Sequence, residues 1–204
     1  MGKVDLNKKL KENSLLKTAF EFFTTKGFSK TSITDIVNKA GVAKGTFYLY
    51  FKDKYDIRNK LVFHKSSQLF KTALSELGES INELPFEEKL IRIIDNIINQ
   101  LNNNQSLLTF ISKNLSWGIF KSAITSPVSE DDINFSEVYY QMLSESPNGF
   151  RDPEIMLFMI IELVSSTCYS VILYREPCSL AELKPYLYKS IRLIISQHEK
   201  KAKK

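Results

Sequence analysis

The sequence predicts an all-α fold, and three observations lead to this prediction. Apolar residues recur at intervals of three and four along most of the 204-residue chain, which is typical of amphipathic helices. Only seven glycines and six prolines interrupt the chain, which favours long helices over many short strands. No segment shows the strict apolar–polar alternation that predicts a strand. Hydrophobic residues make up 43% of the chain, which provides a core and argues against intrinsic disorder.

The predicted helices follow from apolar stripes and from the residues that cap them. Leu16, Ala19, Phe20 and Phe23 form the stripe of the first helix, and Gly27 is suited to end it. About nine helices are expected in all, over residues 6–26, 33–40, 44–50, 54–77, 86–101, 106–124, 133–143, 154–175 and 180–198. In the last of these, Pro185 is expected to make the opening turns irregular.

The second and third predicted helices have the pattern of a helix-turn-helix. Ser32 and Asp35 are spaced as a capping box, and Gly41 can adopt the positive φ of a tight turn. Phe47 and Phe51, four residues apart, share the inner face of the third helix. Its other side chains are then free to enter a DNA major groove, which is about 12 Å wide.

Charge is distributed unevenly along the chain. Residues 1–60 hold 13 Lys and Arg against 6 Asp and Glu, a balance of +7, whereas the remainder has a balance of −2. A basic N-terminal third indicates a polyanionic partner, although a solvated charged face explains the composition equally well. We therefore predict a helix-turn-helix DNA-binding domain over residues 1–53 and a larger helical domain over residues 54–204.

The candidate DNA contacts lie in and just after the third helix. Lys44 and Thr46 are in its first turn, and Gly45 allows close approach of the backbone. The other candidates are side chains suited to a sugar-phosphate edge, a thymine methyl group or a phosphate: Tyr48, Tyr50, Lys52 and Lys54. The alternatives are that the tyrosines are core aromatics and that the lysines are ordinary solvated side chains.

Other function classes find little support in the sequence. The two cysteines, Cys168 and Cys178, lack metal-site spacing, and no paired carboxylates or phosphate-cradling glycine loop are visible. We expect no catalytic site, no metal and no cofactor. No signal peptide is visible, and a reducing, cytoplasmic setting is expected. The apolar stretch 155–174 contains a single charge, Glu162, and is interpreted as a buried interface helix rather than a membrane span.

Residues 28–56 resemble the TetR family of tetracycline-repressor-like regulators. The match consists of Phe-Ser-x-Thr, Ile-Val in the second helix, Ala-Gly-Val at the turn, Lys-Gly-Thr-Phe-Tyr, and then Tyr-Phe-Lys-Asp-Lys. It covers about the first quarter of the chain. The resemblance implies DNA contacts at Thr34, Lys44, Gly45, Thr46, Tyr48, Tyr50 and Lys54. Ala43 departs from the family, because many members have a helix-capping serine there.

The resemblance also implies a palindromic double-stranded DNA operator, a small-molecule effector, and a homodimer built from helices 154–175 and 180–198. Candidate effector contacts are the aromatic and polar residues of the larger domain, namely Phe110, Trp117, Tyr139, Tyr140, Glu162, Cys168 and Tyr169. Core packing is the alternative for each of the aromatic residues. Glu162 could face a cationic ligand, or it could pair across the dimer with Arg175 or Arg192.

The sequence thus predicts a ligand-responsive DNA-binding regulator, with repression implied only by the resemblance. An architectural DNA-binding protein or an activator without an effector is the alternative. Weak sequence preference and an affinity set mainly by salt would distinguish the architectural protein.

Overall fold

A computed structural model describes residues 3–114 and 134–200 of the chain, with side chains from residue 6 onward. Within these ranges the chain forms nine α-helices and one 3-10 helix, and no strand. The elements are α1 (Lys3–Thr25), α2 (Ile33–Ala40), α3 (Lys44–Tyr50), α4 (Lys54–Leu77), η1 (Glu79–Glu83), α5 (Phe86–Asn103), α6 (Gln105–Asn114), α8 (Phe135–Ser144), α9 (Pro153–Tyr174) and α10 (Leu180–His198). The all-α prediction is confirmed.

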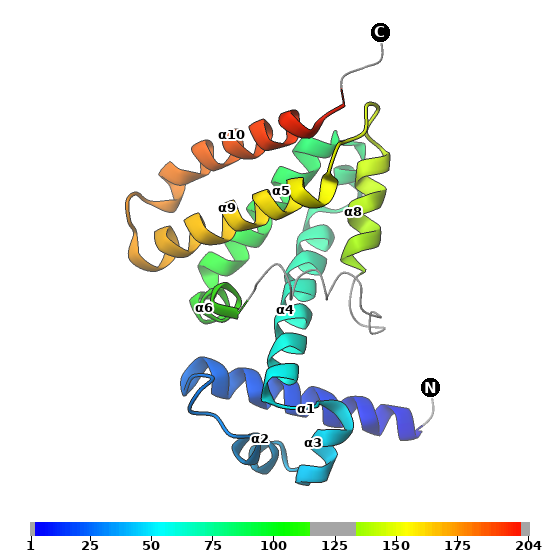
Figure 1. Ribbon diagram of the computed structural model, residues 1–204, viewed down its shortest axis with the longest axis vertical. Coiled ribbons are helices and arrows are strands. Elements are labelled where there is room, and N and C mark those ends of the chain that lie inside the picture. Colours follow the sequence, from blue (N-terminus) through cyan, green and yellow to red (C-terminus); the bar gives the residue numbers. More distant parts are fainter. Residues whose placement is uncertain (1–2, 115–133, 201–204) are drawn as a thin grey trace.

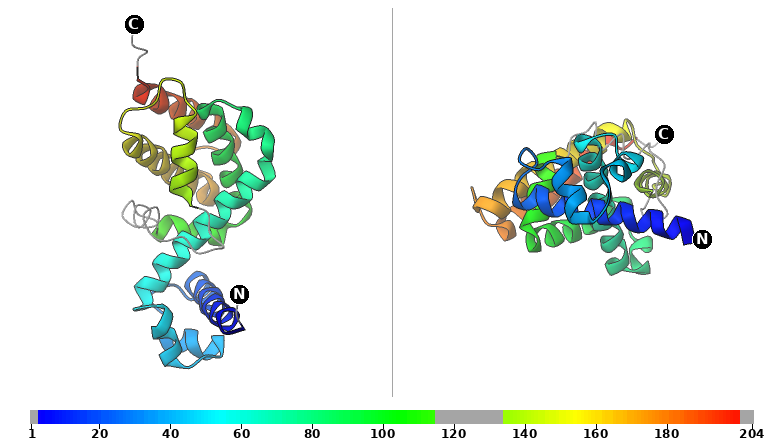
Figure 2. Two further views of the ribbon diagram at one scale, coloured as in Figure 1. Left: turned by 90° about the vertical axis from the view of Figure 1, so that its right-hand side faces the viewer. Right: turned by 90° about the horizontal axis from the view of Figure 1, so that it is seen from below.

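Helix α4 connects two parts of the molecule (Figure 1). Helices α1, α2 and α3 form a small unit at one end, and α4 runs from this unit into a larger body. In the body, α9 and α10 pack against each other, and α10 also packs on α5. A view turned by 90° shows α4 as the bridge between the two parts (Figure 2).

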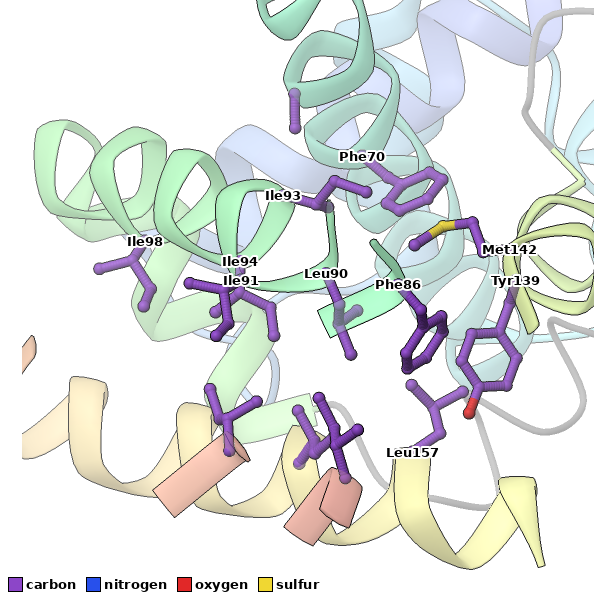
Figure 3. Packing of buried hydrophobic residues seen from close by; sticks show 14 of the residues in the cluster. Phe70, Phe86, Leu90, Ile91, Ile93, Ile94, Ile98, Tyr139, Met142 and Leu157 are labelled. Atoms are coloured by element: carbon purple, nitrogen blue, oxygen red, sulfur yellow. The ribbon is translucent and has the colours of Figure 1, made fainter. Parts of the chain in front are cut away.

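Two hydrophobic clusters hold these parts together. The first, which we call the N-terminal core, contains buried residues of α1, α2, α3, the first two-thirds of α4, and Phe110 and Ile111 of α6. The second, the body core, contains buried residues of α4, α5, α8, α9 and α10 (Figure 3). Because α4 contributes to both clusters and α6 enters the first, burial alone does not divide the chain at residue 53. The division into domains 1–53 and 54–204 stays a prediction.

Helix boundaries mostly follow the predicted caps. The Ser32–Asp35 capping box is present, and Gly41 ends α2 with φ 68° and ψ 31°. Ser179 and Glu182 form a second capping box at the start of α10. The irregular start expected at Pro185 is not seen, because α10 runs through this residue. The 3-10 helix η1 was not predicted.

Helix α9 accounts for the most apolar stretch of the sequence. Among the described helices it is the one long and apolar enough to cross a membrane by length and composition, with a mean hydropathy of 2.0. One third of its most apolar window, 33%, is buried inside the fold. Met156, Leu157 and Ile160 lie in the body core, whereas Ile155, Phe158 and Met159 are exposed. The helix is therefore a core helix on one side with an uncovered apolar face on the other.

Candidate DNA-binding surface and ligand cavity

Local hydrogen bonds fix both ends of α2. Ser32 Oγ accepts from the backbone N–H of Asp35 at 3.1 Å, and the Ser32 backbone donates to the Asp35 carboxylate at 2.9 Å. The Ser32 backbone N–H and the Ser32 hydroxyl, which donates to the same carboxylate at 2.8 Å, lower the pKa of Asp35 below its ordinary value. After Gly41, the Val42 N–H donates to the Val37 carbonyl at 3.1 Å. The end of α2 and the start of the turn are therefore fixed by the backbone and by the left-handed glycine.

Two phenylalanines anchor α3 to the N-terminal core. Phe47 and Phe51 are fully buried, with their ring centroids 5.4 Å apart. Ala43 is the N-cap residue and makes no side-chain cap, as expected from the missing serine. Because α3 is only two turns long and lacks a side-chain cap, its orientation depends on this aromatic packing.

The predicted DNA contacts on α3 differ in how far they are exposed to solvent. Lys44 and Gly45 are exposed, and Thr46 is half-buried. The Tyr48 side chain is 52% exposed and packs edge-on against Phe47, with ring centroids 5.5 Å apart. Tyr50 is half-buried against the N-terminal core. Of the two tyrosines, Tyr48 is the one that stands free of the core, whereas Tyr50 fits the core-aromatic alternative in part.

Three further predicted DNA contacts lie outside α3, and one of them, Lys52, is exposed. Thr34, in the first turn of α2, is exposed. Lys54 is half-buried, and its ammonium donates to the carbonyls of Phe28 and Thr31, both at 2.9 Å. It also lies 4.5 Å from the centroid of the Phe28 ring. Lys54 therefore ties the α1–α2 loop to α4, and one of its three N–H groups is left for a phosphate.

Leu49 is a surface residue that sequence reasoning missed. Its side chain is 80% exposed, the highest exposed fraction among the large apolar side chains of the described residues. Counting from Phe47 would have found it, because a residue two positions away lies on the opposite side of a helix.

An apolar cavity of about 190 Å³ lies in the body, between α4, α5, α6, α8 and α9. Its described lining contains no charged side chain. The polar groups of that lining belong to Ser66, Ser67, Ser112, Ser165 and Cys168. Burial raises the pKa of the Cys168 thiol to about 11, so this side chain stays neutral at physiological pH. The cavity is suited to an uncharged, apolar group.

Of the predicted effector contacts that the structure describes, Cys168 alone lines this cavity. Tyr139 is buried in the body core, its hydroxyl donates to the Pro153 carbonyl at 2.8 Å, and burial raises its pKa. Tyr140 is exposed, and Tyr169 packs at the edge of the body core. Trp117 lies outside the described residues. These positions stay predictions, and the cavity walls belong mainly to aliphatic residues with no distinguishing sequence pattern.

The two other predicted effector contacts have different surroundings. Phe110 packs in the N-terminal core rather than on the cavity. Glu162 is exposed on α9 and is not among the residues that line the cavity. Arg192, one of its two predicted partners, is paired within the chain to Glu87 at 2.8 Å and Glu88 at 2.5 Å.

Helix α6 joins the cavity to the N-terminal core. Leu108, Ile111 and Ser112 line the cavity, and Ile111 also belongs to the N-terminal core. Phe110 packs edge-on against Phe20 of α1, with ring centroids 5.3 Å apart. Helix α6 therefore contacts both the cavity and α1.

Comparison with known proteins agrees with this architecture. Residues 15–61 match the family described as bacterial regulatory proteins, tetR family. The uncharacterized HTH-type transcriptional regulator YvdT of Bacillus subtilis is 54% identical over 44 residues, which cover 22% of this chain and 23% of YvdT. The fatty acid metabolism regulator protein of the same organism is 30% identical over 100 residues, or 49% of this chain and 50% of that protein. The chain thus spans a quarter to a half of the length of these relatives.

A solved structure resembles this chain over most of its length. FadR of Bacillus subtilis, in complex with stearoyl-CoA, superposes with a TM-score of 0.62 at 21% identity. The superposition covers 90% of this chain and 97% of FadR, and it concerns the fold alone. Residues 15–61 therefore match the tetR family of bacterial regulatory proteins, and most of the chain shares the fold of FadR.

Proposed function

We propose that this regulator is a repressor that binds a palindromic operator through α3 and is released when an apolar small molecule enters the body cavity. The observation that carries the proposal is the continuous packing from the cavity wall through α6 to the unit that holds α3. We propose a cytoplasmic location as well, because the operator lies there.

In this proposal, α3 enters the major groove with Lys44, Gly45, Thr46 and Tyr48 directed at the DNA. The exposed positions of Lys44 and Tyr48 support these contacts. Three further predicted contacts take supporting roles at the DNA backbone: Thr34, Tyr50 and Lys54. The ties of Lys54 to two loop carbonyls support a positioning role, with at most one N–H for a phosphate.

A homodimer would present two copies of α3 to one operator. An exposed apolar face supports an interface on α9 and α10, formed by Ile155, Phe158 and Met159 of α9 and by Tyr186 and Leu193 of α10. In a twofold dimer the two reading helices fit successive major grooves when they lie about 34–36 Å apart.

The effector that we propose is a molecule with an aliphatic chain, such as an acyl-CoA thioester. The uncharged cavity lining supports an apolar chain and argues against a buried cation or anion. The charged part of the ligand would then remain in solvent. The stearoyl-CoA complex of FadR makes acyl-CoA thioesters the first compounds to test.

The experiment starts from duplexes that the full-length protein selects out of a random pool, and it measures binding by fluorescence anisotropy. Octanoyl-CoA, lauroyl-CoA and stearoyl-CoA are added in turn, with coenzyme A alone as the control. We expect at least one acyl-CoA to weaken binding by about 5- to 150-fold, and coenzyme A to have no effect. If no acyl-CoA changes the affinity, the proposed effector class is wrong; if one tightens binding, release from the operator is wrong.

Filling the cavity is expected to abolish this response. Val164 lines the cavity, so Val164→Phe places a ring where the ligand chain would lie. We expect this variant to bind the selected duplex normally and to ignore acyl-CoA. Thr72→Phe adds a ring at an exposed position of α4 and is the matched control, which keeps the response. Equal responses of the two variants would contradict the assignment of the cavity.

A further inference from the structure

Leu49 presents an apolar side chain at the centre of the surface that α3 offers to DNA. Leu49 is 80% exposed and is not part of the N-terminal core. Its neighbours along the chain, Tyr48 and Tyr50, are both less exposed. A larger fraction of Leu49 than of either tyrosine is therefore open to solvent.

The helical geometry puts Leu49 on the side of α3 that faces away from the protein. Each residue advances about 100° around the axis, so Gly45 and Leu49, two residues to either side of Phe47, both lie opposite that buried ring. They are one turn apart on the same face. Apart from the adjacent residues and the backbone of α3 itself, no atom comes within 4 Å of the position that a Cβ would take on Gly45, so the surface of α3 is open there.

This outermost line of α3 carries no hydrogen-bonding side chain. It comprises Gly45 and Leu49, while Lys44 and Tyr48 lie to one side. A major groove presents hydrogen-bond donors and acceptors on every base pair, but its one apolar group is the C5 methyl of thymine. A leucine is therefore matched to thymine and to no other unmodified base.

We infer that Leu49 is a specificity-determining residue and contacts the C5 methyl of a thymine in each operator half-site. The inference rests on the proposed DNA-binding function of α3. The +7 balance of residues 1–60 and the flanking Lys44 favour DNA, rather than an apolar protein partner, as the occupant of this face.

The test replaces thymine with deoxyuridine, one position at a time, in the duplex that the wild-type protein selects. This change removes the methyl group and leaves base pairing intact. At one symmetric position we expect the wild type to lose roughly fourfold in affinity for each methyl group removed. Leu49→Ala is expected to bind the thymine and deoxyuridine duplexes equally at that position, whereas Leu49→Met keeps the difference.

Leu10→Ala is the matched control, because Leu10 is also an exposed leucine, on α1. It is expected to keep the full wild-type sensitivity to deoxyuridine. Thermal unfolding checks that each variant is folded, and substitution of an exposed side chain should leave it unchanged. The inference is overturned if the wild type is insensitive to every substitution, or if Leu49→Ala keeps the wild-type sensitivity. Failure to select any duplex would instead overturn the proposed function, on which the inference depends.

Discussion

Replacing Phe110 with alanine is expected to lower the free energy of unfolding by about 3–5 kcal/mol, the range for removal of a buried phenylalanine. The ring is 5% exposed and packs edge-on against Phe20 and stacked on Phe23, the latter with ring centroids 6.4 Å apart. The space left in the N-terminal core lies between α1 and α6, which makes collapse around it difficult. Chemical denaturation followed by circular dichroism measures the change.

The same substitution is expected to weaken the coupling between ligand binding and DNA binding. Phe110 is the aromatic contact through which α6 meets α1, so its loss should reduce the change in operator affinity that acyl-CoA causes. Phe110→Leu keeps most of the volume and is the control, with an expected loss below about 1.5 kcal/mol. A cost of less than 1 kcal/mol for Phe110→Ala would show that this packing is not what joins the two parts.

Removing the carboxylate of Glu145 is expected to cost about 3 kcal/mol, the lower end of the range for breaking a buried ion pair. Lys89 of α5 has a side chain only 4% exposed, and its ammonium donates to Glu145 Oε2 at 2.6 Å. The remaining contact of this ammonium, to the Asn82 carbonyl at 3.5 Å, is long. Glu145→Ala would therefore leave a buried positive charge without a counter-charge. Because the Glu145 side chain is 46% exposed, water softens the penalty.

Substitution of Lys89, the other member of this ion pair, is expected to cost less stability. Lys89→Met removes the buried charge and keeps the apolar stem, so it should change stability by less than about 1 kcal/mol. The double variant, Glu145→Ala with Lys89→Met, should then recover most of what Glu145→Ala loses. Thermal and urea unfolding of the wild type and the three variants measure the free energies of this double-mutant cycle. Equal destabilisation by the two single substitutions would mean that the pair itself, rather than the unpaired lysine, sets the cost.

The caps and the aromatic pair of α2 and α3 could be predicted from sequence, because each depends on residues no more than four positions apart. The Ser32–Asp35 box, the left-handed Gly41 and the Phe47–Phe51 pair depend only on helical spacing, and all are present. The absent cap at Ala43 followed from the same local logic.

Long-range contacts could not be predicted in this way. Lys54 is at the expected place, but its bonds to Phe28 and Thr31 span more than twenty residues. From the sequence, Phe110 could line a cavity or pack in a core. Only the packing of α6 on α1 shows that it lies in the N-terminal core. The cavity is lined by residues of five helices, and the apolar periodicity of any one helix does not predict it.

The most direct test of the account compares operator binding by the wild type with binding by Lys44→Ala and Tyr48→Ala. Fluorescence anisotropy with a duplex selected by the wild-type protein, at several salt concentrations, gives the affinities. Each substitution is expected to weaken binding by about 5- to 150-fold, corresponding to 1–3 kcal/mol, while the unfolding temperature stays unchanged. Lys71→Ala, at an exposed position of α4 outside the DNA-binding unit, is expected to bind as the wild type does. If Lys44→Ala and Tyr48→Ala both bind with wild-type affinity, α3 does not read the operator through this face.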